Sequence, residues 1–402
     1  PSQTETFDPK MGAPSGVRSM TGEILTKLPG ITFGSTFEKL ARLNDKFSVV
    51  RSFTTQSGAH DSKPIVSKYS HNAQIGGHYA RVAGTSHPET GMPRNIWLHP
   101  QAVDAKAKDP IMSLGKFDVT GPLGPAFAPF QPSGKGSFRQ DMKLTVNPSR
   151  LGDRKTLLGS LDQFRRTVES GSLTGGLDKF QSQAFETLSG GVSDAFDLSK
   201  EDPRLLERYD TGAMKPSDGA KKRNSYAEMF SPVALGHQMV LARRLCEAGC
   251  GFVTVTCGGW DMHGGGKEFT MRDGVASLTP AVDRAVSAFI EDVDRRGLTD
   301  KILLVITGEF GRTPRINKNG GRDHWGNLCT LAFAGGGLQM GQVVGRSDRI
   351  AGEPASKPIS SSDVLATIMH VLFDIGELRV RTGAPSDVKQ VLTSGQPISE
   401  LL

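Results

Sequence analysis

Short apolar segments with almost no polar alternation recur through the second half of the sequence. Ile302–Ile306 is apolar throughout, Leu328–Ala334 is nearly so, and Phe252–Cys257 is a third predicted strand. Strands without polar alternation are buried on both faces, so helices must cover both sides of their sheet. Segments of helical period separate these strands, and such alternation is typical of a parallel sheet. The sequence therefore predicts an α/β protein with a doubly wound, mostly parallel sheet.

Three helices are predicted around these strands, because apolar residues there recur at helical spacing. The first covers residues 235–249, and the last runs from about Ser362 to Phe373. The second is expected to have Thr279 as its N-cap and Pro280 in its first turn, and to stop at Gly297.

The first half of the chain gives weaker signals. Phe47–Phe53 suits a strand, and the polar run Thr54–His60 follows it. Apolar residues between 157 and 168 recur at helical spacing, and Gly121–Gly136 is crowded with Gly and Pro, which favours irregular structure. Residues 210–225 are polar and rich in helix breakers, which is typical of a surface linker.

The composition excludes several classes of protein. Of 402 residues, 48 are Lys or Arg and 42 are Asp or Glu, so the formal net charge is a mild +6. No apolar stretch approaches the roughly 20 residues that a membrane helix needs, so no membrane span is predicted. Aromatic residues make up 7% and are not interleaved with a basic stripe, which argues against a nucleic-acid partner. The oligomeric state is not indicated.

Acidic and histidine side chains gather in the loops around the predicted strand ends. Asp261 and His263 follow one strand, Glu309 follows the next, and Asp323 and His324 precede the third. Ligands of open parallel sheets bind beyond the carboxyl ends of the strands. Each residue alone could serve a turn or a helix cap, but three such loops favour a shared site.

The side chains in these loops are of the types that bind metal ions. Carboxylates and imidazoles suit zinc, manganese, magnesium or calcium, with zinc favoured. The four cysteines lack a Cys-x-x-Cys pair, which disfavours zinc held by thiolates. Arg312, Arg322 and Lys63 could hold an oxyanion, since guanidinium donors match phosphate or sulfate. Surface ion pairing is the alternative, and for Lys63 it is the favoured one.

Several motifs resemble a known family. GGWDMHGGG, TGEFGRTPRINKNGGRDHWGN and AGGGLQMGQVVGRSD resemble the DUF1501 proteins, a bacterial group of the alkaline phosphatase-like and sulfatase-like superfamily. The resemblance extends through LARRLCEAGCGFVTV, SSDVLATIMHVLFDIG and the opening PSQTETFDPK, and it is weakest over 105–225. It implies one alkaline phosphatase-like domain over 1–402, with a doubly wound sheet, and with 105–225 as a variable, mostly helical insertion.

The resemblance also implies a ligand set. Glu5 and Asp8 resemble the acidic pair that follows the superfamily's first strand. The sequence begins at Pro1, so the apolar strand that precedes this pair in the family is expected to be missing and the chain to be truncated at its first motif. The full set of metal ligands that the resemblance implies is Glu5, Asp8, Asp261, His263, Glu309, Asp323 and His324.

The nucleophile is the least defined part of the predicted site. Sulfatases of the superfamily use a Cys or Ser in a Cys/Ser-x-Pro-x-Arg motif, and none of the four cysteines lies in one, so a formylglycine sulfatase is not expected. Thr55 and Ser57, just before His60, occupy the place of the superfamily's nucleophile. His60 is a candidate base or ligand. A plain polar loop is the alternative interpretation.

These observations favour a metal-dependent hydrolase of phosphate or sulfate esters, acting on a small-molecule or glycan substrate through one or two divalent ions. The alternative is a non-catalytic protein of the same fold that binds a metal or a glycan at the cell surface. Fold alone does not decide between them. Family members often carry a twin-arginine leader, so the resemblance implies a periplasmic or cell-surface location.

Overall fold

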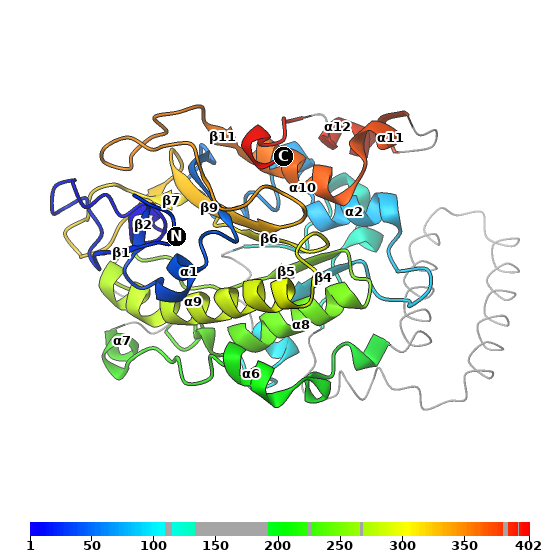
Figure 1. Ribbon diagram of the computed structural model, residues 1–402, viewed down its shortest axis with the longest axis horizontal. Helices are drawn as coiled ribbons and strands as arrows, with labels where there is room; N and C mark the ends of the chain where they lie inside the picture. The colour runs from blue at the N-terminus through cyan, green and yellow to red at the C-terminus, as the bar shows by residue number, and fades with distance from the viewer. Residues whose placement is uncertain (109–114, 133–191, 224–226, 266–267, 381–384, 393) are drawn as a thin grey trace, which may run out of the picture.

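The computed structural model describes residues 1–108, 115–132, 192–223, 227–265, 268–380, 385–392 and 394–402 (Figure 1). The architecture is mixed α/β. Its helices are α1 (Glu38–Arg42), α2 (Ile75–Ala83), α6 (Pro203–Tyr209), α7 (Asp218–Arg223), α8 (Leu235–Glu247), α9 (Met271–Arg295), α10 (Ser361–Leu372), α11 (Ile375–Val380) and α12 (Ser386–Leu392). Its strands are β1 (Glu23–Leu25), β2 (Thr32–Gly34), β3 (Ser48–Thr54), β4 (Asn95–Leu98), β5 (Phe252–Val255), β6 (Leu303–Ile306), β7 (Gly311–Arg312), β8 (His324–Trp325), β9 (Cys329–Gly335), β10 (Val343–Val344) and β11 (Ile359–Ser360).

The main sheet contains β10, β3, β9 and β6 in that order, and β11 also pairs with β3. β10 and β11 are parallel to β3, whereas β9 is antiparallel to both β3 and β6. β4 and β5 form a separate parallel pair. The prediction of a mostly parallel sheet is therefore wrong at β9. A run of apolar residues identifies a buried strand, but it does not encode the direction of the strand's neighbours.

Helices cover both faces of the main sheet, as predicted (Figure 1). On one face, Phe53 of β3 and Phe333 of β9 pack with α10. On the other face, Val49 of β3 and Ala332 of β9 pack with α1 and α9. Successive strand residues point to opposite faces, so the unbroken apolar runs supply both layers of the core.

Helix α9 begins earlier than the sequence analysis predicts. Its N-cap is Thr270, whose hydroxyl accepts a hydrogen bond from a backbone N–H at 3.1 Å, and Pro280 lies inside the helix. Thr279 is therefore a helical residue, and its hydroxyl donates to the carbonyl of Val275 at 2.6 Å. A proline inside a helix costs about 3 kcal/mol. The turns before Pro280 bury apolar side chains such as Leu278 in a cluster of their own, which favours the longer helix.

A buried arginine joins α8 to its neighbours. Arg243 of α8 is 1% exposed, and its Nε donates to Asp292 of α9 at 3.1 Å. Its other nitrogens pair with Glu247, at 2.6 Å, and with Glu201. A buried charge needs such partners. The network ties the loop before α6 to the α8–α9 pair behind β4 and β5.

The middle of the chain is described only in part. The helix predicted between 157 and 168 lies outside the described residues, as does much of the predicted insertion 105–225. Within the described part of 105–225, α6 packs on α8 and α9, and α7 lies in the segment predicted as a linker. Among the described helices, none combines the length and apolar character that crossing a membrane requires.

Candidate metal centre

The reversed direction of β9 brings the loops of the site to one edge of the sheet. Phe53, near the end of β3, pairs with Cys329 at the start of β9, and Ile306, at the end of β6, pairs with Ala332. The chain therefore enters β9 at the edge where it leaves β3 and β6. Had β9 been parallel to them, the residues before it would approach the opposite edge.

Three side chains meet at this edge in a group with metal-binding spacing. His60 comes from the loop after β3, Asp261 from the loop after β5, and His324 from β8, just before β9. One ligand atom of each lies within 4.8 Å of the others. Asp261 and His324 were predicted ligands, and His60 was a predicted base or ligand.

A short antiparallel ribbon positions His324 beside Arg312. In the β7–β8 pair, Arg312 lies opposite His324, and side chains of opposed residues share one face. Arg312 is buried, and its Nη2 donates to Asp261 Oδ1 at 2.6 Å and to the Trp260 carbonyl at 2.9 Å. A cation therefore lies directly against the carboxylate of the group.

In both His324 and His60, Nδ1 contacts a protein oxygen on the side of the ring that faces away from Asp261. Nδ1 of His324 lies 2.7 Å from the carbonyl oxygen of Gly58, and Nδ1 of His60 lies 2.5 Å from Glu309 Oε1. A carbonyl or an ionised carboxylate only accepts hydrogen bonds, so both Nδ1 atoms carry hydrogen. Glu309, predicted as a ligand, is here the partner that orients His60.

The Nε2 atoms of both rings face Asp261. His324 Nε2 lies 2.9 Å from Oδ1, and His60 Nε2 lies 3.5 Å from Oδ2. In a neutral ring whose Nδ1 is protonated, Nε2 offers only a lone pair. If both rings were neutral, the Nε2 lone pairs would face the carboxylate oxygens of Asp261, which can only accept hydrogen bonds, and no hydrogen bond could form. Such an arrangement needs a second proton on each ring or a metal cation between the groups, and the donor types fit a divalent metal.

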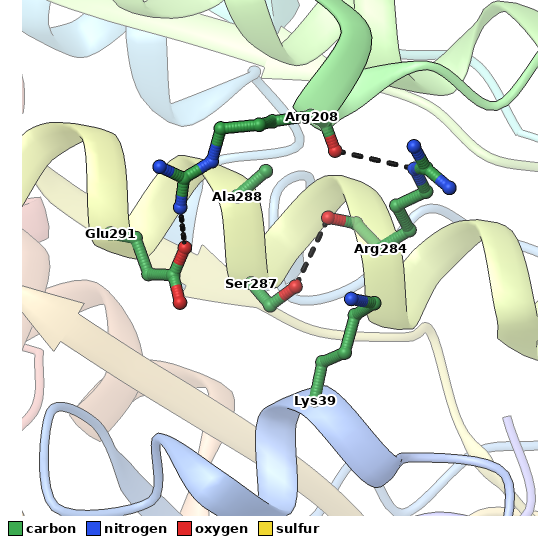
Figure 2. A pocket seen from close by; sticks show the side chains of 6 residues that line it. All are labelled: Lys39, Arg208, Arg284, Ser287, Ala288 and Glu291. Carbon is green, nitrogen blue, oxygen red and sulfur yellow. Dashed lines mark hydrogen bonds and ion pairs between the residues drawn. The ribbon is translucent and has the colours of Figure 1, made fainter. Parts of the chain in front are cut away.

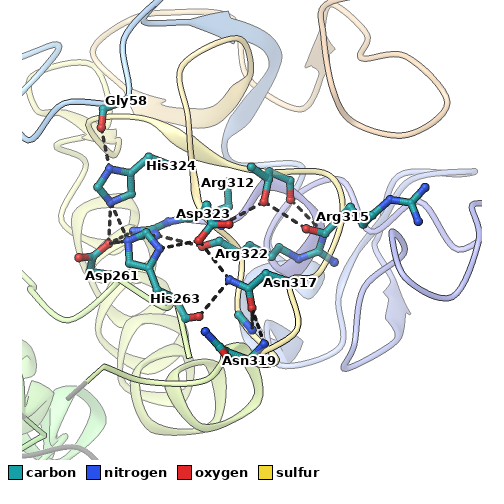
Figure 3. A network of polar contacts seen from close by, with 12 residues as sticks. Gly58, Asp261, His263, Arg312, Arg315, Asn317, Asn319, Arg322, Asp323 and His324 are labelled. Atoms are coloured by element: carbon teal, nitrogen blue, oxygen red, sulfur yellow. Dashed lines mark hydrogen bonds and ion pairs between the residues drawn. The ribbon is translucent and has the colours of Figure 1, made fainter. Parts of the chain in front are cut away.

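His263 repeats the same arrangement next to this group (Figure 3). Its Nδ1 lies 2.9 Å from Asp323 Oδ1, which also accepts from Asn317 Nδ2 at 3.1 Å. Its Nε2 lies 2.9 Å from both His324 Nε2 and Asp261 Oδ1. Asp323, predicted as a ligand, thus holds a histidine. His263 Nε2 faces the same centre as the three grouped residues.

The electrostatics follow from these contacts. Hydrogen bonding to Asp261, then to Glu309, raises the pKa of His60 from its usual 6.5 to about 9. Burial raises the pKa of Asp261, but His324, His60 and Arg312 outweigh burial and hold that pKa well below its usual range. The hydrogen bond from His263 lowers the pKa of Asp323. Without a metal, His60 therefore holds an extra proton at neutral pH.

The predicted N-terminal acidic pair has protein partners. Glu5 is buried, accepts from Ser19 Oγ at 2.9 Å, and lies 3.3 Å from Arg322 Nη2. Arg322 is fully buried as well, and both terminal nitrogens donate to protein oxygens. Asp8 lies 3.3 Å from Lys10 Nζ and also contacts Ser347 and Arg51. These three predicted site residues tie the N-terminal segment to the loops before β9 and after β10.

The predicted nucleophiles lie on the loop that leads to His60. Thr55 Oγ1 donates to the Ser57 carbonyl at 3.0 Å, and Ser57 Oγ accepts from the Ala59 N–H at 3.2 Å. Both residues line a cavity of about 190 Å³, together with Lys63, which pairs with Asp61. The structure thus brings Thr55, Ser57 and Lys63 to one cavity beside the histidine cluster.

A larger cavity, of about 320 Å³, contains none of the predicted site residues (Figure 2). It lies between α1, α6 and α9, with Lys39, Arg208, Arg284 and Glu291 in its wall. Arg208 pairs with Glu291, and Arg284 donates to the Arg208 carbonyl at 3.2 Å. It has no histidine, and we assign it no part in the metal centre.

Two residues of the site, Gly58 and Asn317, were not predicted from the sequence. Gly58 contributes a backbone carbonyl, which no residue pattern reveals. Asn317 holds Asp323 and also donates to the His263 carbonyl at 3.1 Å. Its place in the stretch between two predicted site loops, NKNGGRD, was the only available signal.

Comparisons with known proteins agree with the resemblance at the level of the family. The DUF1501 family, described as "Protein of unknown function (DUF1501)", matches residues 1–402. No curated protein and no solved structure matches the chain.

Proposed function

The chain belongs to the DUF1501 family, and from its own residues we propose that it is a metal-dependent hydrolase of phosphate or sulfate esters. The superfamily assignment, the alkaline phosphatase-like fold and the periplasmic or cell-surface location belong to this proposal. They rest on the resemblance of the motifs described above.

One observation carries the proposal: the Nε2 atoms of two imidazoles face the oxygens of Asp261. Nε2 of His324 lies 2.9 Å and Nε2 of His60 lies 3.5 Å from that carboxylate, while both Nδ1 atoms are held by outer partners. Outer partners of this kind orient metal-ligating histidines in many sites. The orientation of the rings supports a cation at this point.

Zinc is the favoured ion, because two imidazoles and a carboxylate without thiolate are typical ligands of catalytic zinc. Manganese, calcium and magnesium remain alternatives. His60, Asp261 and His324 would be the ligands, and His263 Nε2 is a candidate for a fourth. A divalent metal held there would polarise the ester and lower the pKa of a hydroxyl or water nucleophile.

The chain's own residues would hold the substrate. Arg312 supplies a buried positive charge beside Asp261, and its Nε has no hydrogen-bond partner among the described residues. Ser57 or Thr55 would attack the ester, and Lys63 would contribute a second cation to the neighbouring cavity. Arg322 would have to exchange its protein partners to reach an ester, so the proposal does not use it.

A non-catalytic metal- or glycan-binding protein is the second candidate. It is favoured by the hydroxyls of Thr55 and Ser57, which bond within their own loop and make no hydrogen bond to His60. A catalytic nucleophile normally lies within hydrogen-bond reach of its base or metal.

The test is elemental analysis of the purified protein, joined to a screen of aryl phosphate, phosphodiester and sulfate esters. The hydrolase proposal expects a bound divalent metal, and turnover that a chelator abolishes and the metal restores. A bound metal without hydrolysis of any ester in the screen would favour the non-catalytic binding protein. Metal content at background after growth with zinc, manganese and calcium would contradict the hydrolase and a metal-binding role, and would leave only glycan binding.

A further inference from the structure

We propose that the 190 Å³ cavity beside the loop 54–60 binds an oxyanion group of the substrate, separate from the ester that meets the metal centre. The substrate would then be an ester that carries a second phosphate, sulfate or carboxylate group. This substrate class rests on the proposed function, whereas anion binding by the cavity does not.

The charge of the cavity favours an anion. Lys63 and Lys68 both line it, and its lining, which lies wholly within the described residues, includes no carboxylate. Lys63 is 16% exposed and pairs with Asp61, which lies outside the lining. Lys68 lies 5.1 Å from the centroid of the Tyr69 ring and has no ion pair among the described residues. At least one ammonium group is therefore available to a ligand.

A serine hydroxyl without a protein partner among the described residues lines the cavity. Ser361 is 3% exposed, lines the cavity, and its side chain makes no hydrogen bond to any residue that the structure describes. The hydroxyl is not among the buried polar atoms without a partner, so it is accessible from the cavity. An oxyanion in the cavity would accept a hydrogen bond from this group.

Helix α10 adds to the same preference. Ser361 is the first residue of this 12-residue helix, and the N-cap, Ser360, also lines the cavity. The N-terminus of a helix carries a partial positive charge and attracts anions. Asp363 already caps this terminus by accepting from the Ser360 N–H at 2.9 Å. The ammonium group of Lys68 and the hydroxyl of Ser361 are therefore the lining groups that a bound anion would contact first.

The cavity and the metal centre share a loop. Ser57 lines the cavity, while the carbonyl of the next residue, Gly58, lies 2.7 Å from Nδ1 of His324. One molecule could therefore reach both places if its two charged groups are carried on a compact skeleton, such as a sugar.

Anion binding is tested first on chelator-treated protein, which removes any contribution of a bound metal. Sulfate and inorganic phosphate are titrated by calorimetry against wild type, Lys68→Gln, Ser361→Ala and, as a control, Lys39→Gln. Lys39 lines the other cavity, and its replacement by Gln removes the same single positive charge. We expect saturable binding that Lys68→Gln weakens about tenfold and Ser361→Ala about three- to tenfold. Lys39→Gln should bind like wild type.

The substrate class is tested on metal-loaded protein. The ratio of kcat/KM for a sugar bisphosphate to that for the matching monophosphate should fall about tenfold in Lys68→Gln and stay at the wild-type value in Lys39→Gln. Absence of saturable binding, or equal binding by all four proteins, overturns the pocket. Anion binding that is weakened by Lys68→Gln and Ser361→Ala, in a protein that hydrolyses no ester, would support the anion site and contradict the proposed hydrolase activity.

Discussion

Replacing Glu309 by Gln distinguishes two roles for this residue: it either orients His60 or binds the metal directly. The carboxylate contacts Nδ1 of His60 at 2.5 Å and does not belong to the group of three ligand atoms. Gln keeps the size and one oxygen that can accept from Nδ1, but it loses the negative charge. We therefore expect the ring to stay near its position while its Nε2 becomes a poorer donor to a metal.

The magnitude follows from this geometry. Loss of an orienting partner typically lowers metal affinity about 10- to 100-fold, which corresponds to about 1.4–2.7 kcal/mol of binding free energy. Glu309 is 23% exposed, and Gln retains the hydrogen bond, so we expect a loss near the lower limit. A direct ligand would cost well above 100-fold.

The assay is zinc titration against a chromophoric chelator, at a pH above 9. The pKa of His60 is raised to about 9, so both proteins then have a largely neutral ring and protons no longer compete with the metal. Arg315→Gln is the control, because Arg315 is an exposed residue of the same segment, and its side chain has no ion pair among the described residues. Affinity within threefold of the control would refute the orienting role, and loss of all binding would restore Glu309 as a ligand.

Four further outcomes test the site and the fold. The apparent zinc affinity of wild type should rise about tenfold per pH unit from 7 to 9 and then level off, because the metal displaces a proton from His60; His60→Gln should flatten this profile, and a flat wild-type profile would exclude the displacement. In the metal-free protein the stabilisation by protonated His60 is complete below about pH 6.5 and is lost as the pH rises through about 9, so the melting temperature should fall over that window in wild type and less in His60→Gln. The double change Asp323→Ala with His324→Ala should abolish metal retention without altering the circular dichroism spectrum, whereas global unfolding would make the site structural. Arg243→Leu should lower the free energy of unfolding by about 3 kcal/mol in urea titrations, since it removes the buried cation shared by Glu201, Glu247 and Asp292 and leaves them the more exposed Arg296; a change below about 1 kcal/mol would mean that Arg296 compensates the three carboxylates.

The fold elements that the sequence predicted well are those with a clear apolar pattern. β9, β6 and α10 lie within two residues of their predicted bounds, because a continuous apolar run indicates a strand and apolar residues at helical spacing indicate a helix. β9 is buried along its whole length, whereas β6 is half-buried. The start of α9 was misplaced, since Pro280 is a strong local signal for a first turn and the burial of Leu278 is not visible in the sequence. Tertiary packing decided that boundary.

The candidate site could be predicted as a set of loops but not as a set of contacts. Asp261 and His324 were identified from their neighbours in sequence. The division between ligands and orienting partners was not, because it depends on which nitrogen of each ring faces Asp261. His60 and Glu309 are 249 residues apart, and only the pairing of β3 and β6 with an antiparallel β9 brings them together.

That pairing also has a consequence for biosynthesis. Thr54, at the end of β3, bonds through its hydroxyl to the carbonyl of Gly326, 272 residues later, at 2.9 Å. At synthesis rates of about 5–20 residues per second, β3 therefore leaves the ribosome roughly 15–55 s before the strand that covers its edge exists. Throughout that interval an apolar strand has unpaired edges, which is the state in which nascent chains associate wrongly. Ribosome profiling with pull-down of nascent-chain chaperones would be expected to show occupancy that begins when β3 emerges and ends only after β9 has emerged.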